Sequence, residues 1–203
     1  SRSAPGSLGA FYSFVTLYLG MKFGEHEYKV MGLAPYAGEG GRRQAYRALK
    51  EVFDLAEGDP CEFRWLKPGD RYQILLRHLL GLRFDWIAGG AQQLLEEILL
   101  RWVGLMASRY GGKWLALGGG CFMNVKANML IGEMEGVEDL FVFPSSGDES
   151  NAIGAAYLAY LDLCRQKRIP PDPKPLGPLY LGPEARDDEV EALIRERNLD
   201  GKY

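Results

Sequence analysis

KWLALGGGCFMN, residues 113–124, joins a short apolar run to three consecutive glycines. The run predicts a buried strand over residues 113–117, a turn at Gly118, Gly119 and Gly120, and an apolar helical stretch to about residue 131. Where such a turn leads into a helix, backbone N–H groups and the positive end of the helix dipole stabilise an anion. Glycines at the turn also let a phosphate or a ribose approach the backbone closely.

This glycine turn is therefore a candidate nucleotide site, in which Asn124 would bond a ribose hydroxyl or a phosphate oxygen. Three glycines are a weak signal, and an ordinary tight strand-to-helix turn is an equally good interpretation. The dinucleotide pattern G-x-G-x-x-G fails because residue 123 is Met, and no P-loop pattern is present. Cys121 has no identifiable histidine partner, so we expect a packed thiol there.

A second turn, SSGDESN at residues 145–151, follows an apolar run at residues 140–143 that breaks at Pro144. A helix over about residues 149–165 is predicted after it. Asp148 in this turn is a candidate to bind a cation or to orient a nucleophilic hydroxyl, with Gly147 beside it. The residues alone favour a different role, helix capping, because Asp, Ser and Asn are preferred at helix N-termini.

Lys29 and the two histidines are the remaining candidates for chemistry. Lys29 lies in a segment with nearby glycines and is a candidate to pair with a phosphate, although an ordinary surface lysine is the stronger interpretation. His26 and His78 are far apart in the sequence and lack HxxxH or HExxH spacing. A metal site made only of this chain's own residues is therefore poorly supported.

The order of predicted helices and strands along the chain indicates an α/β fold. Its mixed sheet is expected to be flanked by helices and buried on both faces. Further helices are expected over residues 8–19 (ending at Gly20), 42–55, 91–106 and 187–197. Residues 27–36, which contain Gly32 and Pro35, are expected to form a structured loop or a short turn. Residues 57–84 are expected to be irregular, with short strands or a helical insertion at residues 63–65 and at Tyr72. A Pro-rich stretch after Arg168 predicts a domain edge.

Composition excludes some classes of function. The formal net charge of −3 disfavours nucleic acid as the main partner. Three cysteines without a CxxC pair disfavour a disulfide framework or a structural zinc site, and favour a reducing cytoplasm. No apolar run approaches the ~20 residues that cross a bilayer.

Four motifs together resemble the O-carbamoyltransferase family, which includes nodulation protein U and the cephalosporin and tobramycin carbamoyltransferases. SLGAFYS at residues 7–13 resembles the family's SLGxFYS, and EYKVMGLAPY at 27–36 resembles its EYKVMGLAPYG. The segment from Gly118-Gly119-Gly120 to Asn124 resembles the family's GGVxxN. Residues 144–156 resemble its PxxGDxxxAxGAA. The motifs stand in family order over roughly residues 7–160.

The resemblance implies an actin-like ATPase (ribonuclease H-like) fold, of which residues 1–168 would be the second half. Residues 169–203 would be a linker and the start of a truncated synthase-like domain. In the family, a synthase-like domain makes carbamoyl-adenylate from carbamoyl phosphate and ATP, and the actin-like domain transfers the carbamoyl group to an alcohol oxygen. Iron, or another divalent metal, is held there by two histidines and an aspartate.

By this resemblance, Asp148 is the metal ligand and a catalytic residue, together with Lys29. Gly118, Gly119, Gly120, Asn124 and Gly147 line the nucleotide site. The implied partners are a small-molecule alcohol acceptor, carbamoyl phosphate, and the missing N-terminal half and C-terminal domain of the same polypeptide; a homodimer is also allowed. Nucleic acid and membrane are not expected as partners, and the fragment alone is expected to be inactive.

Two other functions stay open. One is a sugar- or acetate-kinase-like phosphotransferase of the same fold, which would use ATP directly with magnesium. The other is a nucleotide-binding module that has lost its chemistry.

Overall fold

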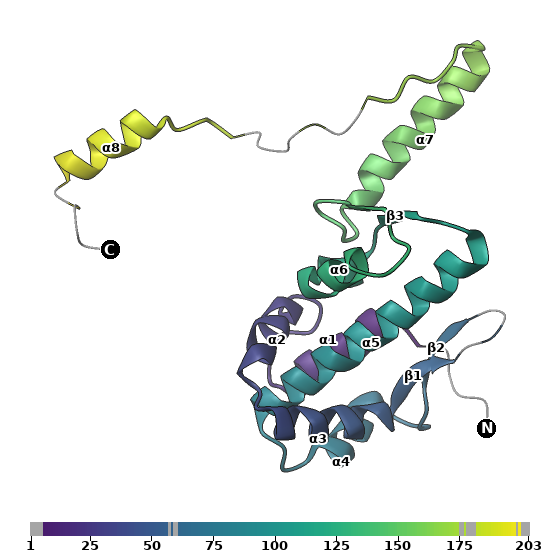
Figure 1. Cartoon of the computed structure of the whole chain (residues 1–203), viewed down its shortest axis with the longest axis vertical. Helices are drawn as coiled ribbons and strands as arrows, with labels where there is room; N and C mark the ends of the chain where they lie inside the picture. Colours follow the sequence, from purple (N-terminus) through teal and green to yellow (C-terminus); the bar gives the residue numbers. More distant parts are fainter. Residues whose placement is uncertain are drawn as a thin grey trace. The chain divides into compact units, whose positions relative to one another are not determined.

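The computed structural model describes residues 6–56, 58, 61–174, 177, 182–197 and 199. The chain divides into two units, Ser1–Ala155 and Ala156–Tyr203. It is a mixed α/β structure in which helices predominate and strands form two small sheets (Figure 1).

The long helix α5 (Phe84–Tyr110) is the centre of the first unit. Its buried stripe includes Ala88, Ala91, Leu95 and Leu99, which recur at helical spacing as predicted. Helix α3 (Glu39–Lys50) packs closely against it. A Cβ on Gly90 would lie 2.5 Å from the backbone nitrogen of Tyr46, so this close approach of the two helices requires glycine.

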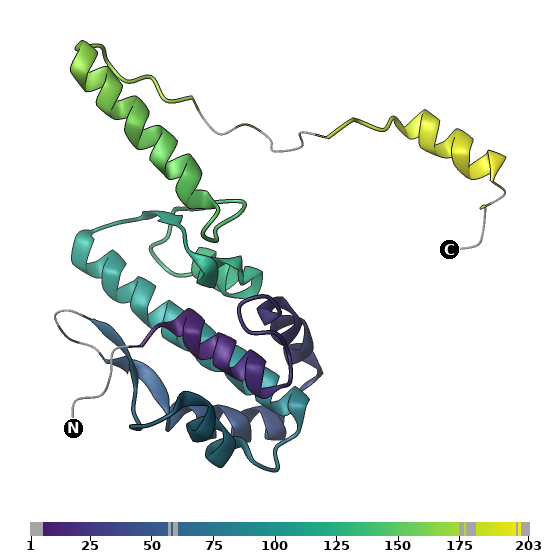
Figure 2. The ribbon, with the colours of Figure 1, turned by 180° about the vertical axis from the view of Figure 1, so that it is seen from behind.

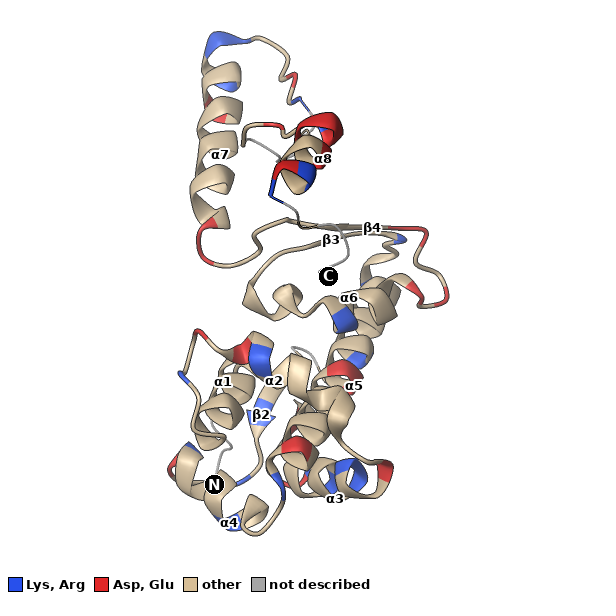
Figure 3. Cartoon of the chain, turned by 90° about the vertical axis from the view of Figure 1, so that its left-hand side faces the viewer, with Lys and Arg blue, Asp and Glu red and all other residues tan. Residues whose placement is uncertain are grey.

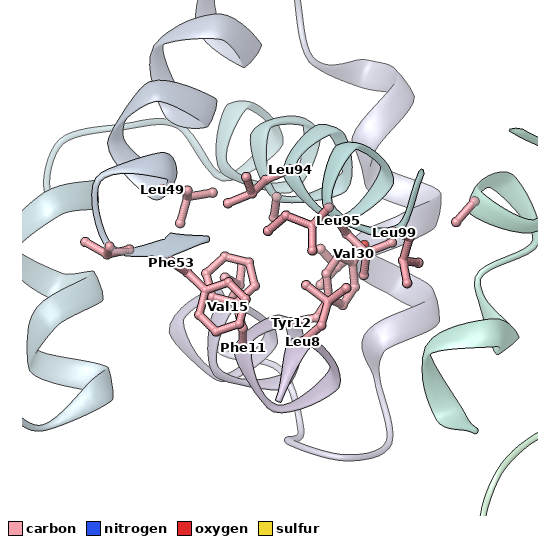
Figure 4. Packing of buried hydrophobic residues seen from close by; sticks show 14 of the residues in the cluster. Leu8, Phe11, Tyr12, Val15, Val30, Leu49, Phe53, Leu94, Leu95 and Leu99 are labelled. Carbon is pink, nitrogen blue, oxygen red and sulfur yellow. The ribbon is translucent and has the colours of Figure 1, made fainter. Parts of the chain in front are cut away.

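Helix α1 (Leu8–Tyr18) lies beside α5 (Figure 2). The hydroxyl of Ser7 caps its N-terminus. It places Phe11 in the core, where the ring stacks on Phe53 at 4.5 Å (Figure 4). The same ring meets Trp65 edge-on at 5.7 Å. The predicted end of this helix at Gly20 is confirmed, because Gly20 follows the cap residue with φ of 76°.

The expectation of a loop over residues 27–36 is wrong. These residues form helix α2 (Glu27–Leu33) and the 3-10 helix η1 (Ala34–Tyr36). Val30 is fully buried in the core, so tertiary packing outweighs the low helix propensity of glycine. Pro35 lies in the first turn of η1, where its missing N–H costs nothing.

The predicted helix over residues 42–55 ends early, because α3 stops at Lys50. The following residues form strand β1 (Phe53–Ala56), which pairs antiparallel with β2 (Glu62–Trp65). Phe53 and Leu55 alternate with Asp54, and this period of two buries both apolar side chains. The strand expected at residues 63–65 is confirmed, whereas Tyr72 lies in helix α4 (Arg71–Leu79), capped by Asp70.

The second sheet pairs β3 (Trp114–Leu117) in parallel with β4 (Asp139–Val142), close to the predicted strands. Between them lie the 3-10 helix η2 (Gly120–Met123) and helix α6 (Val125–Gly132). The expectation that both faces of this sheet are buried is wrong. Leu117 joins the core on one face, but Trp114 is 76% and Phe141 52% exposed, because alternate side chains point to a face that the first unit leaves open.

The second unit contains most of helix α7 (Ser150–Lys167) and helix α8 (Asp187–Glu196), near their predicted positions. The Pro-rich segment after α7 folds back on it, since the Asp172 N–H donates to the Tyr160 hydroxyl at 2.9 Å. Parts of this segment, including Pro175, Pro178 and Tyr180, and most of the chain end lie outside the described residues.

Within the described part of the chain, we find no helix with the length and apolar character of a membrane span.

Five polar side chains join α3, β1 and α5 on the surface of the first unit. Lys50 bonds Asp54 at 3.1 Å and also contacts Glu97. Arg101 donates to Asp54 at 2.8 Å, and the Tyr46 hydroxyl donates to Glu97. Burial, followed by the hydrogen bond to Glu97, raises the pKa of the Tyr46 hydroxyl to about 12.

The same contacts stabilise both carboxylates. Burial opposes the ionisation of Asp54, but hydrogen bonds from the Leu55 N–H, Lys50 and Arg101 hold its pKa below the usual value. Burial likewise opposes the ionisation of Glu97, and Lys50 with Tyr46 lowers its pKa. A carboxyl whose pKa is lowered by folding contributes stability above its unfolded pKa and loses it as the pH falls through its folded pKa.

We therefore expect the free energy of unfolding to fall between about pH 5 and about pH 3. The double variant Asp54→Asn/Glu97→Gln should show a shallower fall, measured by urea unfolding at each pH. The control is Glu25→Gln/Glu39→Gln, in which two exposed ion pairs are removed instead. Equal slopes in the two double variants would contradict the assignment.

Candidate functional site

The two predicted turns meet at one edge of the second sheet. Because β3 and β4 are parallel, with Leu117 opposite Val142, their carboxyl ends lie together. The Gly119 N–H donates to the carbonyl of Ser146 at 2.8 Å, which joins one turn directly to the other. The edge beyond the carboxyl ends of parallel strands is where open α/β sheets bind ligands.

The backbone of the glycine turn is open to approach. Gly118, Gly119 and Gly120 are exposed, and a Cβ built on any of them would meet no atom within 4 Å. Gly119 has φ of 107° and ψ of 152°, a conformation that is essentially restricted to glycine. The turn therefore has the space that the sequence analysis expected for a phosphate or a ribose.

Asn124 lies beneath this turn, 8% exposed, at the start of α6. Its side-chain oxygen accepts from the Ala127 N–H and from Gln92 Nε2, each at 3.0 Å. Its amide nitrogen donates to Gln92 Oε1 at 2.9 Å. The side chain caps α6 and forms a reciprocal amide pair, so it holds the turn in place from below. Its hydrogen bond to a nucleotide stays a prediction.

Gln92 extends this contact to helix α1. The Tyr12 hydroxyl donates to Gln92 Oε1 at 2.8 Å, and Gln92 Nε2 donates to Glu96 at 2.8 Å. Burial, followed by the charges of Glu96 and Glu27, raises the pKa of Tyr12, so its hydroxyl keeps its proton and remains a donor. A buried polar group without a partner is costly, so these paired groups specify one position for the base of the turn.

The second turn presents one free carboxylate. Ser146 is buried, with its carbonyl bound to Gly119, whereas Asp148 is exposed and its carboxylate bonds no side chain or N–H in the described ranges. The Ser145 hydroxyl donates to Glu149, which lowers the pKa of that carboxyl. Gly147 lies against the Glu149 carboxylate. The Asp148 side chain is thus available for a ligand instead of acting as a helix cap.

Lys29 is placed apart from these contacts. It lies on α2 with its ammonium 3.1 Å from His26 Nε2 and 5.7 Å from the centre of the Tyr28 ring. None of its recorded contacts reaches either turn.

The ranges described by the structure contain no group of three His, Cys, Asp or Glu able to hold a metal ion. Asp148 alone does not make a metal site, which needs several ligands.

Sequence reasoning missed two residues of this region, Gln92 and Ser146. Gln92 carried a signal, because it is a polar residue within the apolar stripe that includes Ala88, Ala91 and Leu95. Its partner Asn124 is 32 residues away, and no local pattern identifies such a pair. Ser146 acts through its backbone carbonyl, which no sequence pattern reveals.

The family model described as carbamoyltransferase N-terminus matches residues 2–157. The chain is 28% identical to the uncharacterised protein sll1178 of Synechocystis sp. and 28% identical to the uncharacterised protein MJ1058 of Methanocaldococcus jannaschii, over 94% of this chain in each case. It is 29% identical to nodulation protein NolO of Bradyrhizobium diazoefficiens over 92% of this chain. The chain spans about a third of the length of these relatives, from 31% to 34%.

The conformation of Gly119 predicts a contrast between two neighbouring glycines. We expect Gly119→Ala to lower the free energy of unfolding by about 1–3 kcal/mol, because an L side chain is strained at this φ and ψ. Gly118→Ala is the matched control, since its φ is not positive and its surroundings are equally open. Urea unfolding of both variants tests this, and an equal loss in both would contradict the assigned geometry.

The buried amide pair predicts a second contrast. Gln92→Leu should lower the free energy of unfolding by about 2 kcal/mol or more, because Asn124 and Tyr12 lose buried hydrogen bonds. Gln93→Leu is the control on the same helix, at a half-buried position with no side-chain hydrogen bond in the described ranges. If both variants unfold at the same urea concentration, the pair does not hold the turn.

Proposed function

Because this chain belongs to the carbamoyltransferase N-terminus family, we propose that it is part of an ATP-dependent O-carbamoyltransferase. The complete protein would transfer a carbamoyl group from carbamoyl-adenylate to an alcohol oxygen of a small molecule. Carbamoyl phosphate and ATP would supply the adenylate.

The observation that carries this proposal is the hydrogen bond from the Gly119 N–H to the Ser146 carbonyl. It holds two turns at one sheet edge, one with an open glycine backbone and one with an exposed carboxylate. A nucleotide needs both kinds of surface, since its phosphates and ribose approach a backbone while its reacting group meets a positioned side chain. A single isolated glycine turn would support the proposal much less.

Each predicted residue has a role in this proposal. Gly118, Gly119 and Gly120 leave room for the phosphate and the ribose, Gly147 would line the nucleotide site from the second turn, and Asn124 holds the first turn from below. Asp148 projects its carboxylate beside them and would orient the acceptor hydroxyl or bind a cation. A separate cation, Lys29, would pair with a phosphate oxygen when the nucleotide is bound.

Iron, or another divalent metal, belongs to the proposal for the complete protein only. Asp148 would be one ligand, and the others would come from residues outside this chain. Such a metal would act as a Lewis acid on the carbamoyl group. The residues that the structure describes do not by themselves fit a metal site, so the role of Asp148 in orienting the acceptor is proposed independently of the metal.

The finer architecture is also a proposal. Residues 1–168 would be the second half of an actin-like ATPase domain, and residues 169–203 would lead into a synthase-like domain. The missing parts of the polypeptide, and a second copy of it in a homodimer, are the protein partners that this arrangement suggests. The three cysteines are free, which suits the cytoplasm that we propose as its location.

The test uses the complete polypeptide with ATP, carbamoyl phosphate and iron. We expect carbamoyl-adenylate and AMP by mass spectrometry. Asp148→Asn should leave adenylate formation intact and slow carbamoyl transfer about a hundredfold, which is typical of losing a positioned catalytic group. Asp139→Asn is the matched control, an exposed carboxylate at the opposite end of β4.

Four outcomes would contradict the proposal in whole or in part. Absence of adenylate and AMP would argue against carbamoyl transfer. ADP release on a panel of sugars would favour a phosphotransferase of the same fold. Full transfer by Asp148→Asn would remove Asp148 from the catalytic residues, and a change in stability alone would favour a binding module.

A further inference from the structure

A cavity of about 450 Å³ lies in the first unit, lined by α3, its cap residue Glu51, and α4. Figure 1 shows α3 and α4 at the end of this unit away from β3, so the cavity is separate from the two turns. Its lining residues are Gly40, Arg43, Gln44, Arg47, Ala48, Glu51 and His78. Six of these seven recur at intervals of three or four residues, so they form one face of α3.

Several polar groups around this cavity have no protein partner. Within the described ranges, the guanidinium of Arg47, the amide of Gln44 and the carboxylate of Glu51 make no hydrogen bond or ion pair. Arg47 and Glu51 are four residues apart, a spacing at which opposite charges usually pair on a helix, yet they do not. Arg43 makes a contact with Glu39, which leaves other guanidinium N–H groups available.

His78 is held in a fixed orientation at the other wall. Its Nδ1 lies 2.8 Å from the Ile74 carbonyl, and because a carbonyl only accepts, Nδ1 carries a proton. Nε2 has no hydrogen-bond partner in the part of the chain that the structure describes, and remains for a ligand. Figure 3 marks Lys and Arg positions in blue on the ribbon of α3.

We propose that this cavity binds a phosphate monoester of a small polyhydroxylated molecule. Two arginines one helical turn apart present forked donors to the phosphate, which is the geometry that guanidinium groups match best. Glu51 would repel a phosphate, but it can accept a hydrogen bond from a hydroxyl of the same molecule. Gly40 and Ala48 leave the room that such a ligand needs.

The combination of donors and one acceptor decides the ligand class. Inorganic phosphate satisfies the arginines but leaves Glu51 unpaired, and a free sugar satisfies Glu51 but gives the two guanidinium groups no anion to bind. A sugar phosphate satisfies all three, so it should bind more tightly than either part. This site goes beyond the proposed carbamoyl transfer and does not depend on it.

The two histidines of the chain allow a direct test by NMR. Glucose 6-phosphate is titrated into the full chain, and the imidazole signals are assigned with His26→Gln and His78→Gln. We expect the His78 signal to shift with saturation at about millimolar ligand and the His26 signal to stay unchanged. Inorganic phosphate should bind at least about tenfold more weakly and glucose should not bind.

Two arginine variants that change the net charge equally distinguish binding at this site from a general effect of charge. Arg47→Ala should weaken binding at least about tenfold, while Arg42→Ala, an exposed arginine on the same helix outside the cavity, should not. Glu51→Gln should reduce the advantage of glucose 6-phosphate over inorganic phosphate. An unshifted His78 signal, equal losses in Arg42→Ala and Arg47→Ala, or equal affinity for both phosphates would overturn the proposal.

Discussion

The parallel pairing of β3 with β4, continued by the hydrogen bond from Gly119 to Ser146, is the constraint on which the candidate site depends. Parallel strands bring their carboxyl ends to one edge, so two turns separated by more than twenty residues become neighbours. Only a residue that tolerates the backbone angles of Gly119 can direct its N–H to the second turn. The open backbone and the exposed Asp148 carboxylate are consequences of this one arrangement.

The base of the site is specified by buried polar groups. Gln92 and Asn124 pair through both amide atoms, and Tyr12 adds a third donor from α1. Each group would be costly without its partners, so the helices α1, α5 and α6 have one favourable arrangement beneath the turn. The rigid core thus supports a turn whose upper surface is free of protein contacts.

The sequence predicted these strands well because their signals are local. Residues 114–117 are apolar and are followed by three glycines, and the run at residues 140–143 ends at Pro144. The same logic failed at residues 27–36, where Gly32 and Pro35 suggested a loop although the burial of Val30 stabilises a helix. The helix predicted over residues 42–55 is also wrong beyond Lys50. Two apolar residues at alternate positions, Phe53 and Leu55, are too few to distinguish a strand from the last turn of a helix.

The candidate site was predictable in part for the same reason. The glycine turn and the Asp148 turn were both visible as local patterns, and the structure places them side by side. The residues alone favour a helix cap at Asp148, and only the fold shows that its carboxylate is free. Gln92 was missed because its pairing with Asn124 joins distant residues, and the exposed face of the second sheet was missed because apolar strands alone do not show what covers them.

Hydrogen–deuterium exchange of the complete polypeptide, with and without ATP and carbamoyl phosphate, tests the central claim most directly. The account predicts slower exchange in peptides that cover Gly118–Gly120 and Gly147–Asp148 together, because one bound nucleotide would shield both turns. Unchanged exchange in both turns, with slower exchange elsewhere in residues 6–155, would contradict a nucleotide site at this sheet edge.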